Sequence, residues 1–438
     1  MEQFTAIVLA AGKGERMSSP FPKVLHELAG RPLIYYVLRE LAKLKGELGQ
    51  MVIVVGYKAK TIERQIKSLF KSKAIVLPKG IKIDFVYQPK TLGTANAVDI
   101  ATKAARCDNI LVICGDTPLV TADTLSKFIS SFLEKKPSCL VLTAPMTGKN
   151  TLGTIIRDDN GRIKAIQEKA VASDTLCEFR HRHSSEEVNS GIYCFERMAL
   201  LKYLPQIKLN AKKREYFLTD IIEIIYNNEE ALVDSYFLDN EEEILGINTP
   251  NDLRLAEELM RKRILERFAA KGVKIVDFGT TFIQEDVKIG KNTIIYPFTF
   301  IEKNVIIGSH CSLGPFIRLR KGTSLGNNTQ VGNFLEINRC KLSRNVKVKH
   351  FGYLGDTTVA SGVNIGAGTV VANYDGKHKN KTYIGKNAFI GSDTVLIAPL
   401  RIGERGMTGA GSVVTRNVKA KAVVLGVPAR VFKKKKKG

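Results

Sequence analysis

The segment that decides the fold is VKIGKNTIIYPFTFIEKNVIIGSHCSLGPFIRLR, residues 287–320, in which an isoleucine or leucine returns at every sixth position. A helix repeats about every 3.6 residues and a strand at alternate residues, so neither produces this period. The period fits a solenoid in which each hexapeptide forms one short strand and one turn. Three such strands close a triangular coil, and stacked coils bury the apolar side chains in one core. The segment therefore predicts a parallel β-helix.

The repeat extends well beyond this segment. The six-residue spacing runs from Ile289 to Ile337, resumes at Leu342 after a shift of one residue, and returns from Ile384 to Ile402. Glycine often follows the apolar residue, because a small residue permits a tight corner. A break at about 372–382 predicts a loop that leaves one coil, and insertions of this kind often carry function.

The N-terminal half has a different pattern, in which short apolar strands alternate with amphipathic helical stretches. We expect strands at 5–12, 51–56, 110–116 and 138–144, and a helix at 32–44. Strands of this kind are typical of a parallel sheet buried on both faces. The alternation predicts a doubly wound, Rossmann-like α/β domain that binds its ligands at the carboxyl ends of the strands.

These patterns divide the chain of 438 residues into four parts. The α/β domain covers 1–248. A charged linker helix follows at 249–272, because Thr249-Pro250 supplies an N-cap and a proline suited to the first helical position. The β-helix covers 273–430, and 431–438 form a basic tail.

The composition narrows the function classes. No apolar run approaches the length of about 20 residues that a membrane span needs, and the N-terminus lacks the features of a signal peptide. Seven cysteines without a CxxC pair are typical of a reducing compartment, so we expect a cytoplasmic protein. The net charge is +24, but the basic residues are spread along the chain without interleaved aromatics, which argues against nucleic-acid binding. The charge instead suits a surface that attracts anionic phosphate substrates.

The first strand runs into LAAGKGERM, residues 9–17. Glycines at this turn let backbone N–H groups approach phosphate oxygens, and Lys13 and Arg16 add charged donors. Pro22-Lys23 follows shortly afterwards. LAAGxGxRM followed by PK resembles the signature of the sugar-phosphate nucleotidyltransferases.

From the first strand to about residue 428, the motifs of both domains resemble the bifunctional bacterial N-acetylglucosamine-1-phosphate uridyltransferase/glucosamine-1-phosphate acetyltransferase family. The resemblance implies acetyl transfer from acetyl-CoA to glucosamine 1-phosphate in the C-terminal domain. It implies uridylyl transfer from UTP to N-acetylglucosamine 1-phosphate in the N-terminal domain, which gives UDP-N-acetylglucosamine and pyrophosphate for peptidoglycan and lipopolysaccharide synthesis. It further implies a left-handed β-helix, a Mg²⁺ ion and a homotrimer with acetyl-transfer sites at subunit junctions.

The resemblance also assigns the residues of the N-terminal site. Arg16 and Lys23 would hold the pyrophosphate as catalytic residues, and Asp116 and Asn248 would bind the metal. The nucleotide-binding positions are Leu9, Ala10, Gly12, Lys23, Gln88, Gly93 and Thr94. The sugar-phosphate-binding positions are Gly153, Glu168 and Asn189.

In the C-terminal domain the resemblance makes His350 the general base, a role that suits histidine near neutral pH. Arg320, Tyr353 and Asn364 would contact the amino-sugar phosphate. The acetyl-CoA positions are Ala367, Asn373, Tyr374, Ser392 and Ala410, of which Asn373 and Tyr374 also lie near the sugar phosphate.

Two positions depart from the family pattern. Asn338 stands where the family has a lysine that binds the sugar phosphate, and Gly426 stands where the family has an arginine that meets the coenzyme. An amide in place of an ammonium removes a counter-charge, which Arg339 or Lys321 would have to replace. Two other readings therefore stay open: a nucleotidyltransferase whose β-helix serves only assembly or regulation, and a non-catalytic binding protein.

Overall fold

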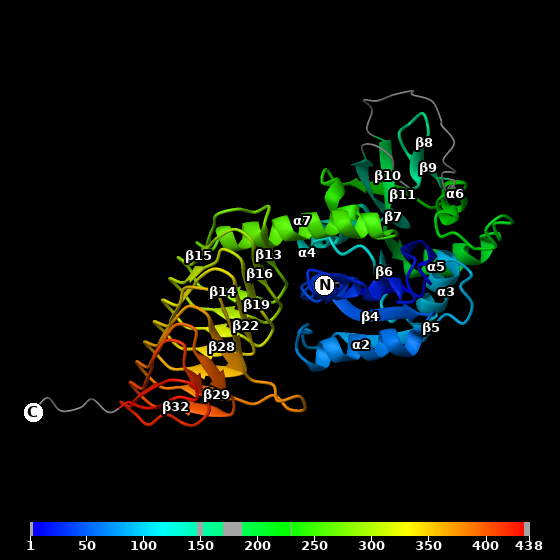
Figure 1. The fold of residues 1–438 in the computed structure, drawn as a ribbon. Helices are drawn as coiled ribbons and strands as arrows, with labels where there is room; N and C mark the ends of the chain where they lie inside the picture. Colours follow the sequence, from blue (N-terminus) through cyan, green and yellow to red (C-terminus); the bar gives the residue numbers. More distant parts are fainter. Residues whose placement is uncertain (1–2, 147–151, 170–185, 229, 433–438) are drawn as a thin grey trace, which may run out of the picture. The chain divides into compact units, whose positions relative to one another are not determined.

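The structure is a computed structural model that describes residues 3–146, 152–169, 186–228 and 230–432 (Figure 1). The chain forms two compact units, Met1–Glu257 and Glu258–Gly438, and each is described by itself. The lysines of the predicted tail, 433–437, lie outside the described residues.

The N-terminal unit is built on a nine-stranded sheet in the order β11-β7-β10-β6-β1-β4-β5, with β8 beside β10 and β9 beside β8. The four predicted strands are present, with boundaries that differ by a few residues: β1 (Phe4–Ala10), β4 (Leu48–Val55), β6 (Asn109–Cys114) and β7 (Cys139–Met146). The others are β5 (Lys82–Tyr87), β8 (Thr154–Arg157), β9 (Ile163–Gln167), β10 (Glu186–Glu196) and β11 (Val233–Phe237). A separate small sheet pairs β2 (Glu27–Leu28) with β3 (Arg31–Pro32).

The sheet is mixed: the four predicted strands run in the same direction, and the antiparallel strand is β10, which the sequence pattern did not predict. β1 pairs in parallel with β4 and β6, and β4 pairs in parallel with β5. β10 lies between β6 and β7 and is antiparallel to both. An apolar run shows that a strand is buried but not in which direction its neighbour runs, so the sequence pattern could not supply this feature.

Seven α-helices lie in the described part of the chain: α1 (Leu33–Leu41), α2 (Ala59–Lys71), α3 (Thr94–Ala104), α4 (Ala122–Lys135), α5 (Arg197–Tyr203), α6 (Asp220–Tyr226) and α7 (Pro250–Ala269). Four short 3₁₀ turns accompany them: η1 (Glu15–Met17), η2 (Lys23–Leu25), η3 (Leu204–Gln206) and η4 (Glu241–Ile244). α7 begins at the predicted proline. The Thr249 hydroxyl accepts from the Asp252 N–H, and the Asp252 carboxylate accepts from the backbone of Asn248 and Thr249, which satisfies the free N–H groups at the helix start.

The C-terminal unit is the predicted β-helix, made of three sheets whose strands pair in parallel from coil to coil. The first sheet holds β12 (Lys274–Ile275), β15 (Ile294–Ile295), β18 (Ser312–Leu313), β21 (Gln330–Val331), β24 (Lys347–Val348), β27 (Asn364–Ile365), β30 (Phe389–Ile390), β33 (Met407–Thr408), β35 (Val423–Leu425) and, antiparallel at its end, β36 (Arg430–Val431). The second sheet holds β13 (Thr281–Ile283), β16 (Thr299–Ile301), β19 (Ile317–Leu319), β22 (Leu335–Asn338), β25 (Gly352–Gly355), β28 (Thr369–Ala372), β31 (Val395–Ile397) and β34 (Val413–Val414). The third sheet holds β14 (Lys288–Ile289), β17 (Ile306–Ile307), β20 (Ser324–Leu325), β23 (Lys341–Leu342), β26 (Thr357–Val359), β29 (Thr382–Ile384) and β32 (Leu400–Ile402).

The register explains the repeat and its irregularities. Ile295 pairs with Leu313 and Leu313 with Val331, so each coil takes three hexapeptides and stacks equivalent apolar residues. These side chains are buried, and they form the core that the period predicted. From Ile337 to Leu342 the corner is one residue shorter, which is the shift seen in the sequence.

The predicted loop leaves the coil between β28 and β29. A bridge between Tyr374 and Lys379 closes it, and the Asp375 carboxylate accepts from the backbone N–H groups of Lys377 and His378. The prediction of an insertion at about 372–382 is therefore confirmed, and Figure 1 shows the loop in orange beside β28 and β29.

Candidate functional site

The N-terminal site begins where β1 ends and the glycine-rich turn follows. Gly14 has a φ of 70°, a left-handed value that favours glycine. A Cβ at this position would lie 2.6 Å from the Cβ of Lys23, so the missing side chain lets this turn pack directly against η2. This close packing fixes the position of the Lys23 backbone, from which its side chain extends into the site.

The Lys23 ammonium lies between the two predicted metal ligands. It contacts the Asp116 carboxylate and donates to the Asn248 side-chain oxygen at 3.0 Å. The Lys23 and Asp116 side chains are 17% and 12% exposed. The structure therefore brings a carboxylate and an amide oxygen to one cation, and this donor set fits Mg²⁺.

A backbone contact explains how Asn248 reaches Asp116 across more than a hundred residues of sequence. Asp116 follows β6, and its carbonyl oxygen accepts from the Ile247 N–H at 2.9 Å. The turn that follows is fixed by the capping contacts of Asp252 at the start of α7. The position of Asp116 at the end of β6 and the cap at the start of α7 thus bring the Asp116 and Asn248 side chains together.

Two predicted nucleotide-binding residues lie between β5 and α3: Gln88 directly follows β5, and Gly93 directly precedes α3. The Gln88 side chain is buried, and its amide nitrogen donates to the Gly93 carbonyl at 3.1 Å and to the Asn96 side chain at 2.9 Å. Both amide hydrogens therefore hold this turn together, and the Gln88 side-chain oxygen is the group left for a base edge. Gly93 has a φ of 97°, and a Cβ there would collide with the Tyr216 backbone.

The predicted sugar positions meet on three adjoining strands. The Asn189 N–H donates to the Gly153 carbonyl at 2.8 Å, and Glu168 directly follows β9, which pairs with β8. The Asn189 amide donates to the Tyr193 hydroxyl at 2.6 Å. Burial raises the pKa of Tyr193 well above its usual value, so this hydroxyl stays protonated.

Two links join the sugar positions to the rest of the site. The Thr219 hydroxyl donates to Glu168 at 3.0 Å, and the neighbouring Leu218 N–H donates to the Thr94 hydroxyl at 3.0 Å. On the other side, β10 runs beside β6, which leads into Asp116. The predicted nucleotide, sugar and metal positions therefore lie around one region at the carboxyl ends of β1 and β6.

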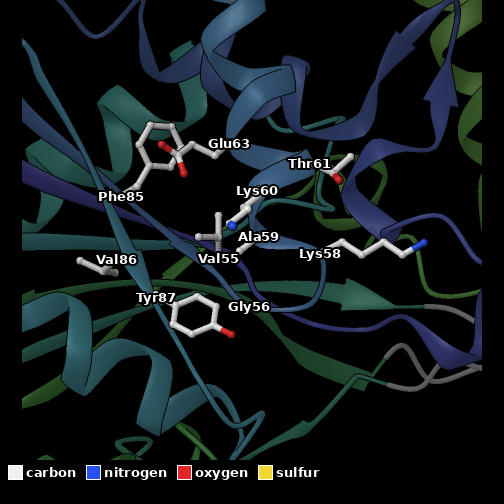
Figure 2. A pocket seen from close by; sticks show the side chains of 10 residues that line it. All are labelled: Val55, Gly56, Lys58, Ala59, Lys60, Thr61, Glu63, Phe85, Val86 and Tyr87. Atoms are coloured by element: carbon white, nitrogen blue, oxygen red, sulfur yellow. The ribbon is translucent and has the colours of Figure 1, made fainter.

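Two pockets open beside this region. One of about 590 Å³ is lined by Lys13 on the glycine-rich turn and by Gln88 to Leu92 on the opposite wall. A larger one of about 770 Å³ lies between α2 and β5, and Figure 2 shows Tyr87 and Lys58 on its wall. Lys58 and Tyr87 line both pockets. Neither residue belongs to the glycine-rich or metal-binding motifs from which the sequence predicted the site.

The basic residues of the glycine-rich turn are exposed. Arg16 lies on the surface of η1. Lys13 donates to Glu15 at 2.9 Å, and this hydrogen bond raises its pKa. In the structure Lys13 is thus paired locally, whereas Lys23 is the basic residue directed at the acidic end of the site.

In the β-helix, four predicted residues share one edge between the first and second sheets, which we call the groove edge. They are His350, Ala367, Ser392 and Ala410, at equivalent corners of successive coils. The carbonyls of Ala367 and Ser392 accept from the corner of the next coil, at Asp393 and Gly411. The predicted general base and the three predicted acetyl-CoA positions therefore lie in one row along this edge, with exposed His350 at one end.

The same edge changes character at His350. On the N-terminal side it carries exposed phenylalanines at left-handed corners, and Phe298, Phe316 and Phe334 stack with ring centroids 4.6 and 4.9 Å apart. Phe351 continues this file, and beyond it come Gly368, Asp393 and Gly411. Beyond His350, glycine and aspartate thus replace the bulky rings at this corner. We call the four phenylalanines the phenylalanine ladder.

The predicted acceptor residues lie on two different faces beside the groove edge. Tyr353 points outward on the second sheet, next to Glu336. Glu336 accepts from Arg320 at 2.9 Å, and Glu302 lies 3.7 Å from the same arginine. Asn364 lies on the first sheet, whose outward side chains diverge from those of the second. Tyr353 and Asn364 therefore belong to different faces of the β-helix.

Asn338 and its neighbours form a closed polar network on the short corner between the second and third sheets. Asn338 is 6% exposed, and its oxygen accepts from Arg339 at 3.1 Å. Arg339 also donates twice to Asp356, at 2.6 and 2.7 Å, and Asp356 accepts from Asn373 at 2.5 Å. The arginine hydrogen bonds hold the pKa of Asp356 below its usual value.

This network affects how the lysine that the family has at position 338 could be replaced. The Arg339 charge is already matched by Asp356, so Arg339 is a weaker substitute for a phosphate-binding lysine than its place in the sequence suggested. Lys321 is exposed, and its backbone N–H donates to Glu302. Tyr374 is 60% exposed on the inserted loop, and Lys379 lies in the same loop.

The fold and the two groups of residues define a nucleotidyltransferase unit joined to a hexapeptide-repeat transferase unit. The family model for nucleotidyl transferases matches residues 5–255, and the model for the bacterial transferase hexapeptide (six repeats) matches residues 286–321. Both classes of protein that the sequence patterns indicated are thus confirmed.

Whole-length relatives identify the family. The bifunctional protein GlmU of Lactococcus lactis strain IL1403 is 38% identical, with 98% of this chain and 96% of the relative covered. GlmU of Heliobacterium modesticaldum is 36% identical over 97% and 96%, and GlmU of Caldicellulosiruptor saccharolyticus is 34% identical over 96% and 94%. The chain belongs to the bifunctional GlmU family, which confirms the resemblance in the sequence motifs and the enzyme class that it implied. A solved structure, HddC from Yersinia pseudotuberculosis, is similar to this chain with a TM-score of 0.43 and 20% identity, and the similarity covers 59% of this chain and all of that one.

Proposed function

We propose that the N-terminal unit transfers a uridylyl group from UTP to N-acetylglucosamine 1-phosphate, and that the β-helix supplies this acceptor by acetylating glucosamine 1-phosphate. The observation that carries the proposal is the convergence of Lys23, Asp116 and Asn248 at the carboxyl ends of β1 and β6, with the sugar positions on the adjoining strands. This is the edge at which α/β sheets bind their ligands.

In the uridylyl transfer, a phosphate oxygen of the sugar attacks the α-phosphorus of UTP, and the bond to the pyrophosphate oxygen breaks. The nucleophile is already an anion, so no covalent enzyme intermediate is needed, and the protein acts by alignment and charge neutralisation. Arg16 and Lys23 would hold the departing pyrophosphate. Asp116 and Asn248 would hold Mg²⁺, which supplies charge stabilisation on the phosphates when bound.

Sugar recognition would fall to the three-strand segment. Glu168, held by Thr219, offers carboxylate oxygens to sugar hydroxyls, and Asn189 lies beside Gly153 for the N-acetyl group. The side-chain oxygen of Gln88 and the backbone at Gly93 would contact the uracil.

In the acetyl transfer, the amine nitrogen of glucosamine 1-phosphate attacks the thioester carbonyl, and coenzyme A leaves as the thiol. His350 would take the proton from the attacking amine. The small residues along the groove edge, Ala367, Ser392 and Ala410, would border the acetyl-CoA. Their file ends at His350, which would place the thioester beside the base.

We further propose a homotrimer formed by the β-helices. The phenylalanine ladder exposes four rings, with 53%, 43%, 62% and 55% of Phe298, Phe316, Phe334 and Phe351 accessible in one chain. Burial of such a row is favourable, and a contiguous exposed apolar row is typical of an interface. The divergence of Tyr353 and Asn364 supports the same proposal, because a second copy is needed to complete a cavity at the groove edge.

A cytoplasmic location is also proposed. In the described part of the chain no helix is long and apolar enough to cross a membrane. The cysteines that the structure describes are free thiols, and burial raises the pKa of Cys114 to about 12 and that of Cys340 to about 11. Protonated, buried thiols are typical of a protein that uses cysteine for packing.

The decisive experiment is mass spectrometry of the products from UTP, acetyl-CoA and a panel of hexosamine 1-phosphates. We expect acetylated glucosamine 1-phosphate with acetyl-CoA alone and UDP-N-acetylglucosamine when UTP is added. A UDP-sugar formed only from a ready-made N-acetyl sugar would refute the acetyl-transfer half and leave the β-helix as an assembly domain. A nucleotide other than UTP as the preferred donor would refute the uridylyl half.

A further inference from the structure

A buried carboxylate joins the two parts of the chain that carry the predicted metal ligands. One part, 116–121, runs from Asp116 to the start of α4, and the other, 243–248, runs from η4 to Asn248. We call them the ligand segments. The Glu243 carboxylate, in a residue that is 8% exposed, accepts from the Thr121 N–H at 3.0 Å and from the Thr124 hydroxyl at 2.7 Å.

The two ligand segments are therefore held together near both ends. At one end the Ile247 N–H donates to the Asp116 carbonyl at 2.9 Å, next to the ligand side chains. At the other end the Glu243 carboxylate holds Thr121, which is 122 residues away in the sequence. A carboxylate that is removed from water has to keep its hydrogen bonds, so η4 cannot move away from α4 without a loss of free energy.

The contact does more than complete the start of α4. The Thr121 hydroxyl already caps this helix, because it accepts from the Thr124 N–H at 3.2 Å. In a local capping box, a glutamate three residues after the capping threonine would accept from the threonine N–H. This chain has Thr124 at that position and receives the carboxylate from η4 instead. The same hydrogen bond that completes the helix start thus also connects the two ligand segments.

A second buried carboxylate at the start of α4 offers a comparison. Glu40 on α1 is 5% exposed, and it accepts from the Ala122 N–H at 3.2 Å. It also accepts from Arg39 and Lys43 at 2.9 and 2.6 Å. Glu40 therefore joins α4 to α1, which carries none of the predicted site residues, whereas Glu243 joins α4 to the segment that ends at Asn248.

We propose that Glu243 is a positioning residue for metal binding, which holds the two ligand segments together so that the Asp116 and Asn248 oxygens face one ion. This inference rests on the proposed uridylyl transfer and its Mg²⁺ ion. Glu243 acts through the backbone of the ligand segments and does not bind the metal itself. Residues that orient metal ligands in this way typically change metal affinity or activity by about ten- to a hundred-fold when they are replaced.

The first test is Mn²⁺ binding in the absence of nucleotide, measured by calorimetry or electron paramagnetic resonance. Glu243→Ala should weaken it by about ten-fold or more. Glu243→Gln keeps an acceptor oxygen for both donors and should retain most of the affinity. An unchanged Mn²⁺ affinity in the alanine variant would overturn the proposal.

Turnover gives a second measurement on the same variants. The kcat of uridylyl transfer by Glu243→Ala should fall by about ten-fold at limiting Mg²⁺ and recover in part as Mg²⁺ rises. The KM for N-acetylglucosamine 1-phosphate should stay within about two-fold, because the sugar positions lie on other strands. A loss of activity that no Mg²⁺ concentration relieves, together with a raised KM, would mean general damage to the fold and would count against the proposal.

Glu40→Ala is the matched control, because it removes a buried carboxylate of the same kind from the same helix start. It should lower the melting temperature but leave the Mn²⁺ affinity within about two-fold. An equal loss of affinity in both alanine variants would show that any disturbance of α4 weakens the site, and it would overturn the specific role of Glu243.

A double variant separates the capping of α4 from the contact between the ligand segments. Thr124→Glu together with Glu243→Ala provides a local carboxylate for the Thr121 N–H, so the melting temperature should recover. The Mn²⁺ affinity should stay low, because the new carboxylate does not reach η4. Recovery of the affinity would show that Glu243 acts only as a helix cap. If Glu243→Ala alone does not fold, this double variant carries the same test.

Hydrogen exchange distinguishes failure of this inference from failure of the proposed function, because it needs neither metal nor substrate. The peptide that contains the Ile247 N–H should exchange about ten-fold faster in Glu243→Ala and at the natural rate in Glu40→Ala, as read by mass spectrometry. Unchanged exchange would overturn the inference even in an active enzyme. A natural chain that neither binds Mn²⁺ nor turns over UTP would refute the proposed function instead, whatever the exchange shows.

Discussion

The two units assemble their sites in opposite ways. In the N-terminal unit, loops from distant parts of the sequence converge, so that Lys23, Asp116 and Asn248 meet within one chain. In the β-helix the site residues stand on an edge and on faces that point away from each other, as Tyr353 and Asn364 do. A sheet with helices on its faces gathers strand ends at one edge, whereas a closed coil turns its non-core side chains outward.

This difference between the α/β unit and the β-helix shows what each fold needs in order to form a cavity. The N-terminal unit buries Asp116 to 8% exposure by itself. The groove edge stays open in a single chain, and the phenylalanine ladder beside it remains unburied. We therefore expect uridylyl transfer to be a property of one chain, and acetyl transfer to be a property of the assembly.

The largest expected effect separates the two sites. Asp116→Ala removes the only charged member of the predicted metal pair and should lower uridylyl transfer by about a thousand-fold or more. Acetyl transfer should stay within about two-fold, because its residues belong to a separate core. Pyrophosphate release and free-thiol release measure the two reactions separately. Loss of both activities in a folded variant would contradict the two-site description.

The next prediction tests the assembly. Phe316→Glu combined with Phe334→Glu places charges in the phenylalanine ladder and should convert the proposed trimer to a monomer in light scattering. Acetyl transfer should fall by about a hundred-fold, while uridylyl transfer stays nearly unchanged. Ile306→Glu is the matched control, since Ile306 is 51% exposed on the third sheet, away from the ladder. A monomer with full acetyl transfer would show that one chain completes the site after all.

A smaller effect concerns the departure at Asn338. Asn338→Lys should restore a charged contact to the sugar phosphate, worth about 1.5 to 3 kcal/mol, and lower the acceptor KM by about ten- to a hundred-fold. The kcat should change little, because His350 is untouched and the contact is the same before and during the reaction. An unchanged KM would show that Lys321 or Arg339 already supplies the charge. If the natural chain has no acetyl transfer and the lysine does not create it, the β-helix is an assembly domain.

The smallest expected effect concerns metal binding by Asp116 and Asn248, which Lys23 contacts in the N-terminal unit. Lys23→Met removes the ammonium that occupies the space between Asp116 and Asn248, so Mn²⁺ should bind about five-fold more tightly in the absence of nucleotide. Calorimetry or the electron paramagnetic resonance signal of Mn²⁺ measures this without turnover. Lys13→Met is the control, because Lys13 pairs with Glu15 and does not contact either ligand. Weaker Mn²⁺ binding in the Lys23 variant would mean that Lys23 helps to hold the two oxygens in place.

Much of the fold was fixed by local sequence. The period of six determined the β-helix, its shortened corner at Ile337 to Leu342 and its inserted loop, because each coil repeats the same contacts and a change in spacing marks a change in the coil. The glycine-rich turn with Lys23, and the order of motifs after it, determined the nucleotidyltransferase class. Apolar runs located the strands of the sheet, since burial on both faces leaves a continuous apolar segment.

Other features required the tertiary structure. The antiparallel direction of β10, the use of the Gln88 amide to hold Gly93, and the pairing of Arg339 with Asp356 all depend on which distant segments become neighbours. Sequence spacing reports the periodicity of a segment and not the identity of its partner across space. For that reason the sequence indicated Arg339 as a positive charge available near Asn338. Only the stacked coils showed that Arg339 is already hydrogen-bonded to the Asp356 carboxylate of the next coil.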